Sequence, residues 1–299
     1  MNKILVIGSL GFIGNHVFNY FKQIGWQVFG CDVLHSDQDN YYKIDQSLSQ
    51  FPEIILQTKP NVCINAAGSG VVSMSHENPA LDYELNTIVV QKILESIRMF
   101  YPSCKFIQIS SAAVYGNPKQ LPIRVTSTIR PLSPYGWHKY QGELICKEYF
   151  ECFGVHSVIL RIFSAYGPNL RKQILWDLYS KCKNNPQNIV LFGTGNESRD
   201  FIHIYDLVKA IECVVNHDPF SAKAINVANG VEVFIKDIAG YFIQHFKSAV
   251  KISFNGIQRK GDPTNWLADI GVLKSYGYEE TIGIEQGIQS YIQWLNELK

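Results

Sequence analysis

Short apolar runs alternate with longer amphipathic segments over the first half of the chain. The mostly apolar runs lie at residues 3–7, 27–31, 62–64 and 106–109. Runs of this length without polar alternation are typical of strands buried on both faces of a parallel sheet, and the segments between them are long enough for crossover helices. Strands and helices are therefore expected to alternate from residue 3 to about residue 165, which predicts an α/β fold with a doubly wound parallel sheet.

One helix is marked at both of its ends. Ser133 is suited to cap the N-terminus, Pro134 fits the first turn, and Gly154 fits the end. The apolar residues in its second half are Leu144, Ile145, Tyr149, Phe150 and Phe153. The sequence therefore predicts a helix over residues 134–153.

The pattern loosens after Pro168. A helix is predicted over residues 172–182. Residues 201–204, 206–215 and 224–228 have the pattern of a strand, a helix and a second strand. We expect this strand, helix and strand to return to the parallel sheet.

This return predicts two interleaved domains. The sheet domain is expected to comprise residues 1–165 plus 201–228, and a smaller lobe residues 166–200 plus 229–299. A chain of 299 residues with 46% apolar content is long enough to fill both. We expect the active site to lie in the cleft between them.

A glycine loop follows the first predicted strand directly and opens a helical pattern. Its glycines are Gly8, Gly11 and Gly14. Glycines let the backbone approach a pyrophosphate closely, and a helix N-terminus offers unpaired N–H groups to an anion. The order of strand, glycine loop and helix therefore indicates a dinucleotide site, although a tight turn without a ligand would give the same pattern.

Asp32 ends the second predicted strand. A carboxylate at this offset accepts hydrogen bonds from an adenosine ribose and repels a 2′-phosphate. The residue therefore favours NAD(H) over NADP(H). The alternative is that Asp32 only begins a loop.

Ser111, Tyr135 and Lys139 can supply a hydroxyl, a phenol and an ammonium to one site. Oxidising an alcohol with a nicotinamide requires a base for the hydroxyl proton as the hydride leaves. A lysine four residues after a tyrosine shares its helix face, and its charge favours the phenolate. Tyr135 is thus the expected acid/base group, Lys139 the residue that tunes it, and Ser111 the donor to the reacting oxygen; the alternative is an ordinary solvated helix face.

Further segments extend this pattern along the chain. They are residues 65–68 with Ala66, Ala67 and Gly68, Asp45, Asn86, the strand at 160–168 with Ile162 and Ser164, the block at 192–207 with Arg199, and the block around Arg259 and Asp262. Together with the glycine loop and the Ser-Tyr-Lys set, the chain resembles the extended short-chain dehydrogenase/reductase family, in its nucleotide-sugar epimerase, dehydratase and reductase branch. The resemblance implies a Rossmann-type domain with a smaller interleaved C-terminal substrate-binding lobe.

The resemblance also implies roles for individual residues. The cofactor-binding set is Gly8, Gly11, Phe12, Ile13, Gly14, Asp32, Asp45, Ala66, Ala67, Gly68, Asn86, Tyr135, Lys139 and Ile162. The substrate-binding set is Ser111, Ala112, Ser164, Arg199, Arg259 and Asp262. Arg199 and Arg259 would contact a nucleotide diphosphate, for which a guanidinium fork is well matched. The alternative is that they only pair with Asp200 or Asp262.

Departures from the family pattern narrow the chemistry. Dehydratases of this branch have acidic residues directly after the catalytic hydroxyl, where this chain has Ala112 and Ala113. Members that epimerise next to a ketone have a cysteine there. Ser164 stands where many members have an asparagine. Dehydration, decarboxylation and ketone-adjacent epimerisation are therefore disfavoured.

Two reactions that transfer a hydride at sugar C4 agree with the sequence. A 4-ketoreductase of an NDP-4-keto-6-deoxy sugar is marginally favoured, because the short span between Asp32 and residue 62 leaves little chain to retain a cofactor. The alternative is an NDP-sugar 4-epimerase of the UDP-glucose or UDP-GlcNAc type with retained NAD. A reductase of a steroid-like or flavonoid-like ketone would not need Arg199 and Arg259, and a non-enzymatic dinucleotide sensor would not need the Ser-Tyr-Lys set.

Composition limits partners and location. The formal net charge is +1, which does not indicate binding to nucleic acid or to an anionic membrane. There is no run of 18 apolar residues, and the apolar run near the N-terminus is too short for a signal peptide. The seven cysteines lack metal-ligand spacing. We expect no metal, reduced thiols, a cytoplasmic location and, from the family resemblance, a homodimer formed through the helix at 133–153 and a helix at about 86–99.

Overall fold

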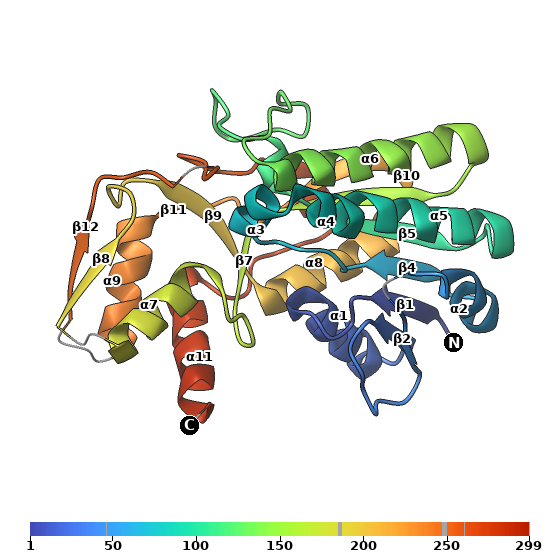
Figure 1. Ribbon diagram of the computed structural model, residues 1–299, viewed down its shortest axis with the longest axis horizontal. Coiled ribbons are helices and arrows are strands. Elements are labelled where there is room, and N and C mark those ends of the chain that lie inside the picture. The colour runs from blue at the N-terminus through green and yellow to red at the C-terminus, as the bar shows by residue number, and fades with distance from the viewer. Residues whose placement is uncertain (46, 185–186, 247–249, 260, 299) are drawn as a thin grey trace.

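A seven-stranded parallel sheet forms the centre of the computed structural model, which describes residues 1–45, 47–184, 187–246, 250–259 and 261–298 (Figure 1). Across the sheet the strands are β3 (Tyr41–Lys43), β2 (Gln27–Asp32), β1 (Lys3–Ile7), β4 (Val62–Asn65), β5 (Lys105–Ser111), β6 (Ser157–Ile162) and β10 (Ser221–Val227). The strand order reverses between β1 and β4, which is the point where open α/β sheets bind ligands. The predicted doubly wound, Rossmann-type sheet is confirmed.

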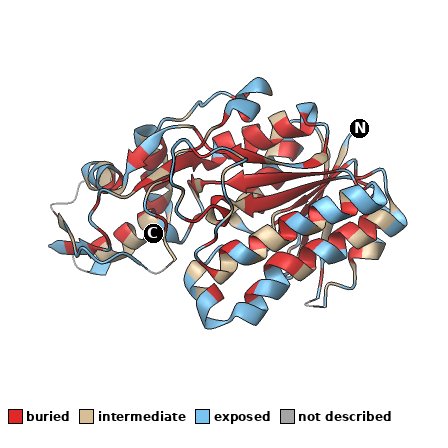
Figure 2. Ribbon diagram, turned by 90° about the horizontal axis from the view of Figure 1, so that it is seen from above, coloured by how far each residue is buried: buried red, intermediate tan, exposed pale blue. Residues whose placement is uncertain are grey.

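Helices cover both faces of this sheet. On one face lie α1 (Phe12–Gln23) and α8 (Ile204–His217), with the short α10 (Gly271–Ser275) against α8; on the other lie α2 (Phe51–Thr58), α5 (Val89–Phe100) and α6 (Pro134–Phe153). Figure 2 shows the central strands buried along their length and the helices exposed only on their outer sides. The two faces thus hold two separate apolar cores, as a doubly wound sheet requires.

Short helical turns bring loop residues to the carboxyl edge of the sheet. Between β4 and α5 the chain forms α3 (Val72–Glu77), α4 (Pro79–Tyr83) and the π-helical turn η1 (Glu84–Ile88), and after β5 it forms the 3-10 turn η2 (Ala112–Val114). The Asn78 side chain caps α4 by accepting from the Leu81 N–H. The π-helical geometry widens the helix at Asn86, a feature common at functional sites.

The remaining elements gather at the end of the molecule opposite α2 (Figure 1). They are β7 (Ser164–Tyr166), β9 (Ser198–His203) and β11 (Glu232–Phe234) in one small sheet, β8 (Asn188–Leu191) and β12 (Lys251–Phe254) in another, and the helices α7 (Gln173–Asn184), α9 (Ile235–Phe246) and α11 (Ile284–Glu297). These elements share a third apolar core. The division of the chain into two domains at the predicted residues stays a prediction.

One expectation about this region is wrong. Residues 201–204 do not return to the central sheet, because β9 pairs in parallel with β7 and antiparallel with β11. Both edges of β6 are already occupied, by β5 and β10, and β7 starts directly after β6 as a new edge for β9. The predicted helices at 172–182 and 206–215 and the strand at 224–228 do form, as α7, α8 and β10.

The helix α6 has the predicted ends. The Ser133 hydroxyl accepts from the Gly136 N–H at 3.2 Å, Pro134 lies in the first turn, and Gly154 ends the helix at φ +69°. No helix among the described residues is long and apolar enough to cross a bilayer. All seven cysteines are free thiols.

A buried ion pair joins α6 to β6. Arg161 Nη2 lies 2.7 Å from Glu143 Oε2, and both side chains are buried. Glu143 also accepts from the Ser110 hydroxyl at 2.6 Å, and Arg161 Nη1 donates to the Tyr115 hydroxyl at 2.9 Å. Because each charge is compensated and hydrogen-bonded, the pair fixes the position of α6 on the sheet.

Replacing Arg161 with Met should lower the free energy of unfolding by about 3–5 kcal/mol, because the Glu143 carboxylate is then buried without a cation. Urea unfolding followed by circular dichroism measures this. The control is Lys147→Ala, which removes an exposed pair with Glu151 on the same helix and should leave the transition nearly unchanged. Equal stability of the two variants would contradict the role given to the buried pair.

Candidate active site

The glycine loop has no room for a side chain at Gly8 or Gly14. At Gly8, where φ is +78°, an added Cβ would lie 2.6 Å from the Ala67 nitrogen, and at Gly14 it would lie 2.0 Å from the Gly8 oxygen. Gly11 is the N-cap of α1 and provides no side-chain cap, so the first N–H groups of the helix stay open to an anion. The loop therefore fits the pyrophosphate of a dinucleotide.

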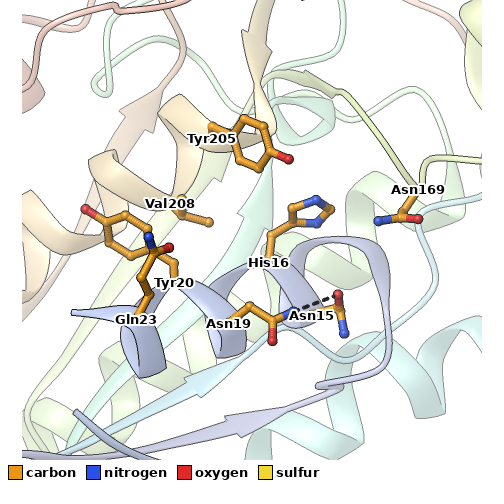
Figure 3. A pocket seen from close by; sticks show the side chains of 8 residues that line it. All are labelled: Asn15, His16, Asn19, Tyr20, Gln23, Asn169, Tyr205 and Val208. Atoms are coloured by element: carbon orange, nitrogen blue, oxygen red, sulfur yellow. Dashed lines mark hydrogen bonds between the residues drawn. The ribbon is translucent and has the colours of Figure 1, made fainter. Parts of the chain in front are cut away.

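A hollow lies at this helix end. It has a volume of about 230 Å³ and is lined by Leu10, Gly11, Phe12, Asn15 and Asn169. A second cavity, of about 240 Å³, continues along α1 and α8 and lies outside the Ser-Tyr-Lys site. Figure 3 shows its amide and ring side chains, with Asn15, His16, Asn19, Tyr20 and Gln23 on α1 and Tyr205 and Val208 on α8. The predicted Phe12 thus lines the hollow at the loop, and Ile13 follows it in the first turn of α1.

Asp32 lies at the carboxyl end of β2 beside the glycine loop. One carboxylate oxygen accepts from the Leu10 N–H at 3.0 Å and the other from the Val33 N–H at 2.8 Å. Asp32 therefore shapes the loop directly, and its contact with a ribose stays a prediction.

Asp45 is further from the loop and exposed. It accepts from the Ser47 hydroxyl at 2.6 Å and from the Leu48 N–H, and hydrogen bonding, led by the one with Ser47, lowers the pKa of its carboxyl group. These bonds hold its own turn, and its contact with an adenine stays a prediction.

Ser111, Tyr135 and Lys139 come together at the carboxyl end of β5. Ser111 ends that strand, where its hydroxyl accepts from the Ala113 N–H at 3.1 Å, and Tyr135 lies in the first turn of α6. Burial raises the pKa of the Tyr135 phenol, and the nearby Ser111 hydroxyl opposes the rise. A hydroxyl and a phenol thus face the same point, as proton transfer to an alcohol requires.

Lys139 lies one turn further along α6 and is 5% exposed. Its ammonium donates to the Ile109 carbonyl at 3.1 Å. Burial, together with the charge of Lys172, lowers its pKa to about 8, although the carboxylates of Asp82 and Glu143 act in the opposite direction. The ammonium is therefore held in place at low solvation, where its field on neighbouring groups is strong.

Gly68 connects this cation to the predicted cofactor residues. Its φ is +121°, and an added Cβ would lie 2.5 Å from Asn86 Oδ1 and 3.4 Å from Lys139 Nζ. Ala66 and Ala67, just before it, lie against Gly8. The structure thus brings residues 66–68, Asn86, Lys139 and the glycine loop into one continuous surface.

The other predicted positions lie at neighbouring strand ends. Ile162 ends β6 opposite Ser111, and the buried Ala112 follows Ser111 in η2. Ser164 begins β7 opposite Phe201 of β9. Ser111, Ala112 and Ile162 are therefore adjacent, whereas Ser164 stands in the next small sheet.

Arg199, Arg259 and Asp262 form a charged group on the smaller sheets. Arg199 donates to the carbonyls of Ser198 and Thr264, and Arg259 lies 4.4 Å from the ring centre of Phe192. Burial raises the pKa of Asp262, and both arginines oppose the rise. Arg259 also lies 3.9 Å from the Asp177 carboxylate, so it interacts with a second acidic residue besides Asp262.

The alternative pairing with Asp200 is wrong. The Asp200 carboxylate is fully buried and accepts from the backbone N–H groups of Asn229, Gly230 and Ala268. Arg199 is the neighbouring strand residue, so its side chain leaves the opposite face of β9. The carboxylates that act on the two arginines are therefore Asp262, Asp177, which lies 3.9 Å from Arg259, and Glu197, which acts on Arg199.

Sequence reasoning missed three ionisable residues near the site, namely Asp82, His138 and Lys172. Asp82 and His138 are hydrogen-bonded to each other, and His138 directly precedes Lys139 on α6. Asp82 lies one helical turn before Asn86, and this spacing was the available signal. Lys172 lies in a loop, with its nitrogen 3.5 Å from where a Cβ on Gly70 would stand, and no sequence pattern marked it.

Comparison with protein families matches residues 4–228 to the NAD-dependent epimerase/dehydratase family. The chain is 26% identical to the UDP-glucuronate 4-epimerase of Thermodesulfobacterium geofontis, over 99% of this chain and 97% of the relative. The match spans nearly the full length of both proteins.

Solved structures give the same picture. The UDP-glucuronic acid 4-epimerase of Bacillus cereus, in complex with UDP-glucuronic acid and NAD, superposes with a TM-score of 0.89 at 25% identity, covering 99% of this chain and 100% of that one. The UDP-N-acetylglucosamine 4-epimerase of Methanobrevibacter ruminantium, in complex with UDP-N-acetylmuramic acid, gives 0.89 at 25% identity, covering 100% and 99%.

Replacing Gly14 with Ala should abolish dinucleotide binding, because the added methyl group would overlap the Gly8 oxygen and displace the loop. Titration calorimetry with NAD measures this. Gly240→Ala in α9 is the matched control, since nothing lies within 4 Å of its added Cβ. The control should bind NAD as the unchanged protein does, and equal affinity of both variants would refute the assignment of the loop.

Proposed function

Since the chain belongs to the NAD-dependent epimerase/dehydratase family, we propose that it is a nucleotide-diphosphate-sugar 4-epimerase that retains its NAD. The observation that carries this proposal is the Ser111–Tyr135–Lys139 group next to the glycine loop, in which Gly8 and Gly14 leave no room for a side chain. The alanines after Ser111 leave no carboxylate there for dehydration. The reaction that fits is a reversible hydride transfer at a sugar alcohol.

In this mechanism Tyr135 takes the proton of the C4 hydroxyl and later returns it. Ser111 donates a hydrogen bond to the same oxygen, and Lys139 favours the phenolate by its charge. NAD held at Gly8, Gly11 and Gly14 would supply the hydride chemistry, namely acceptance of the C4 hydride and its return to the opposite face of the sugar. The burial of Lys139 makes its field on the phenol stronger than it would be in water.

The support for epimerisation comes from the relatives. The proteins named above are 4-epimerases, one of them in complex with NAD. The sequence alone marginally favoured a 4-ketoreductase, which stays the second candidate. The observation in its favour is that little chain connects β2 to β4. Among the described residues, this connection forms the three-residue β3 and the eight-residue α2.

The substrate in this proposal is a UDP-sugar whose diphosphate lies between Arg199 and Arg259. Arg199 donates to backbone carbonyls, and the ion pair of Arg259 with Asp177 is long, at 3.9 Å, so both guanidinium groups keep donors for a phosphate. The family resemblance further implies a homodimer. Apolar side chains that stay exposed on α5 and α6 support it, namely Met99, Phe100, Trp137, Leu144 and Phe153.

Freshly purified protein should contain near-stoichiometric NAD that resists dialysis, identified after acid release. It should interconvert UDP-glucose and UDP-galactose, or the corresponding N-acetyl or uronic pair, without added cofactor. Chromatographic separation of the C4 epimers measures the reaction. Tyr135→Phe should keep its NAD and lose about 10²–10⁴-fold in kcat, because the proton acceptor is gone.

A protein that is readily emptied of cofactor and oxidises NADH or NADPH once for each 4-keto sugar would establish the ketoreductase in place of the epimerase. Full activity of Tyr135→Phe would refute both.

Arg199→Ala and Arg259→Ala should each raise KM for the UDP-sugar about tenfold to a hundredfold, because a charged hydrogen bond to phosphate is lost. Initial rates over a range of substrate concentration measure this, with Lys147→Ala, on the exposed side of α6, as control. Unchanged KM in both arginine variants would point to a substrate without a diphosphate, such as a steroid-like ketone.

A further inference from the structure

A hydrogen-bonded pair, His138 and Asp82, lies next to the catalytic group. His138 Nδ1 is 2.6 Å from Asp82 Oδ2, and the Asp82 side chain is fully buried. His138 precedes Lys139 on α6, and Asp82 on α4 lies one turn before Asn86. The Thr87 hydroxyl also donates to the His138 carbonyl at 3.0 Å. Each member of the pair thus neighbours a residue of the proposed active site.

The second oxygen of Asp82 determines which way Asn86 faces. Asn86 Nδ2 donates to Asp82 Oδ1 at 3.1 Å. An ionised carboxylate only accepts hydrogen bonds, so the amide nitrogen must face Asp82 and the amide oxygen must point away. The same argument places a proton on His138 Nδ1. Asp82 therefore sets the orientation of both of its neighbours.

The amide oxygen so directed reaches the site. Asn86 Oδ1 is buried and has no hydrogen-bond partner among the described residues. It points at the space beside Gly68, and Lys139 Nζ borders the same space. A buried, unpaired acceptor is costly, and such a group in a native structure indicates a functional partner. The partner expected here is the bound dinucleotide or the Lys139 ammonium.

Asp82 also acts through its charge. Its carboxylate raises the pKa of both Tyr135 and Lys139. Of the other charged groups that act on Lys139, Lys172 is a cation and Glu143 is bound to Arg161. His76 and Glu77 on α3 and Glu84 in η1 are exposed. Asp82 is thus the buried carboxylate next to the site that no arginine or lysine neutralises.

We propose that Asp82 and His138 are positioning residues of the active site: Asp82 holds the Asn86 amide toward Lys139 and places a buried carboxylate near the ammonium, while His138 hydrogen-bonds to that carboxylate. This inference rests on the proposed function for the role of Lys139. In this proposal the catalytic lysine is influenced by a buried carboxylate that does not itself contact the reacting atoms.

The test is Asp82→Asn, which keeps the shape and removes the charge. Its kcat should fall about tenfold to a hundredfold with KM changed little, because Asn86 loses its fixed orientation. Without the carboxylate the pKa of Lys139 and of Tyr135 both fall, so the whole pH profile of kcat should move by about one pH unit to lower pH. The control is Glu84→Gln, which removes an exposed carboxylate in the same segment. It should change neither kcat nor the pH profile of kcat.

Two further variants separate the parts of the proposal. His138→Gln retains a donor for Asp82 and should keep most of the activity. Asn86→Ala leaves the Asp82 charge in place, so its kcat should fall while its pH profile stays. Equal losses of kcat in Asp82→Asn and His138→Gln, with no displacement of the pH profile of kcat, would show that these residues act only through packing and would overturn the proposal. If Asp82→Asn does not fold, the proposal is decided by the comparison of His138→Gln, which should keep most of its kcat, with Asn86→Ala, which should not.

A second readout does not depend on the reaction. The Tyr135 phenolate is titrated at 295 nm in the NAD-loaded protein, as the difference between each protein and its Tyr135→Phe version. In Asp82→Asn the phenol should titrate at lower pH than in the unchanged protein. A coincident titration overturns the proposal, and inactivity of the unchanged protein toward UDP-sugars, with the titration displaced, would instead refute only the proposed function.

Discussion

The ion pair between Glu143 and Arg161 is the interaction on which the active site depends. It crosses from α6 to β6 inside the protein, and Ser110 and Tyr115 complete its hydrogen bonds. Because uncompensated charges are so costly there, the helix has one stable position on the sheet. Tyr135 and Lys139 lie on that helix, so their distance from Ser111 at the end of β5 is set by a contact that touches no reacting atom.

The glycine loop imposes the second constraint, which is steric. Gly8 and Gly14 pack so closely against Ala67 and against each other that no side chain fits at either position. The close approach leaves the N-terminus of α1 open and places residues 66–68 beside Lys139. The same absence of side chains thus forms both the pyrophosphate site and the wall of the catalytic site.

Several charged groups act on the buried Lys139 ammonium. Lys139 is buried, and the charge of Lys172 lowers its pKa while the Asp82 carboxylate raises it. Burial alone would favour a neutral amine, whereas a cation is needed to favour the Tyr135 phenolate. The balance between desolvation and the Asp82 carboxylate is therefore as much a part of the chemistry as the Ser-Tyr-Lys group itself.

The sequence by itself determined what depends on local pattern. Mostly apolar runs predicted the parallel strands, Ser133 and Gly154 marked the ends of α6, and the loop glycines marked the turn at Gly8, because these signals come from neighbouring residues. Tertiary structure alone decided that β9 joins β7, since this depends on which strand edges remain free. It also decided that Asp82 meets His138 and that the charge of Lys172 acts on Lys139. These contacts join residues far apart in the chain, and their energies arise only when burial removes water from both charges.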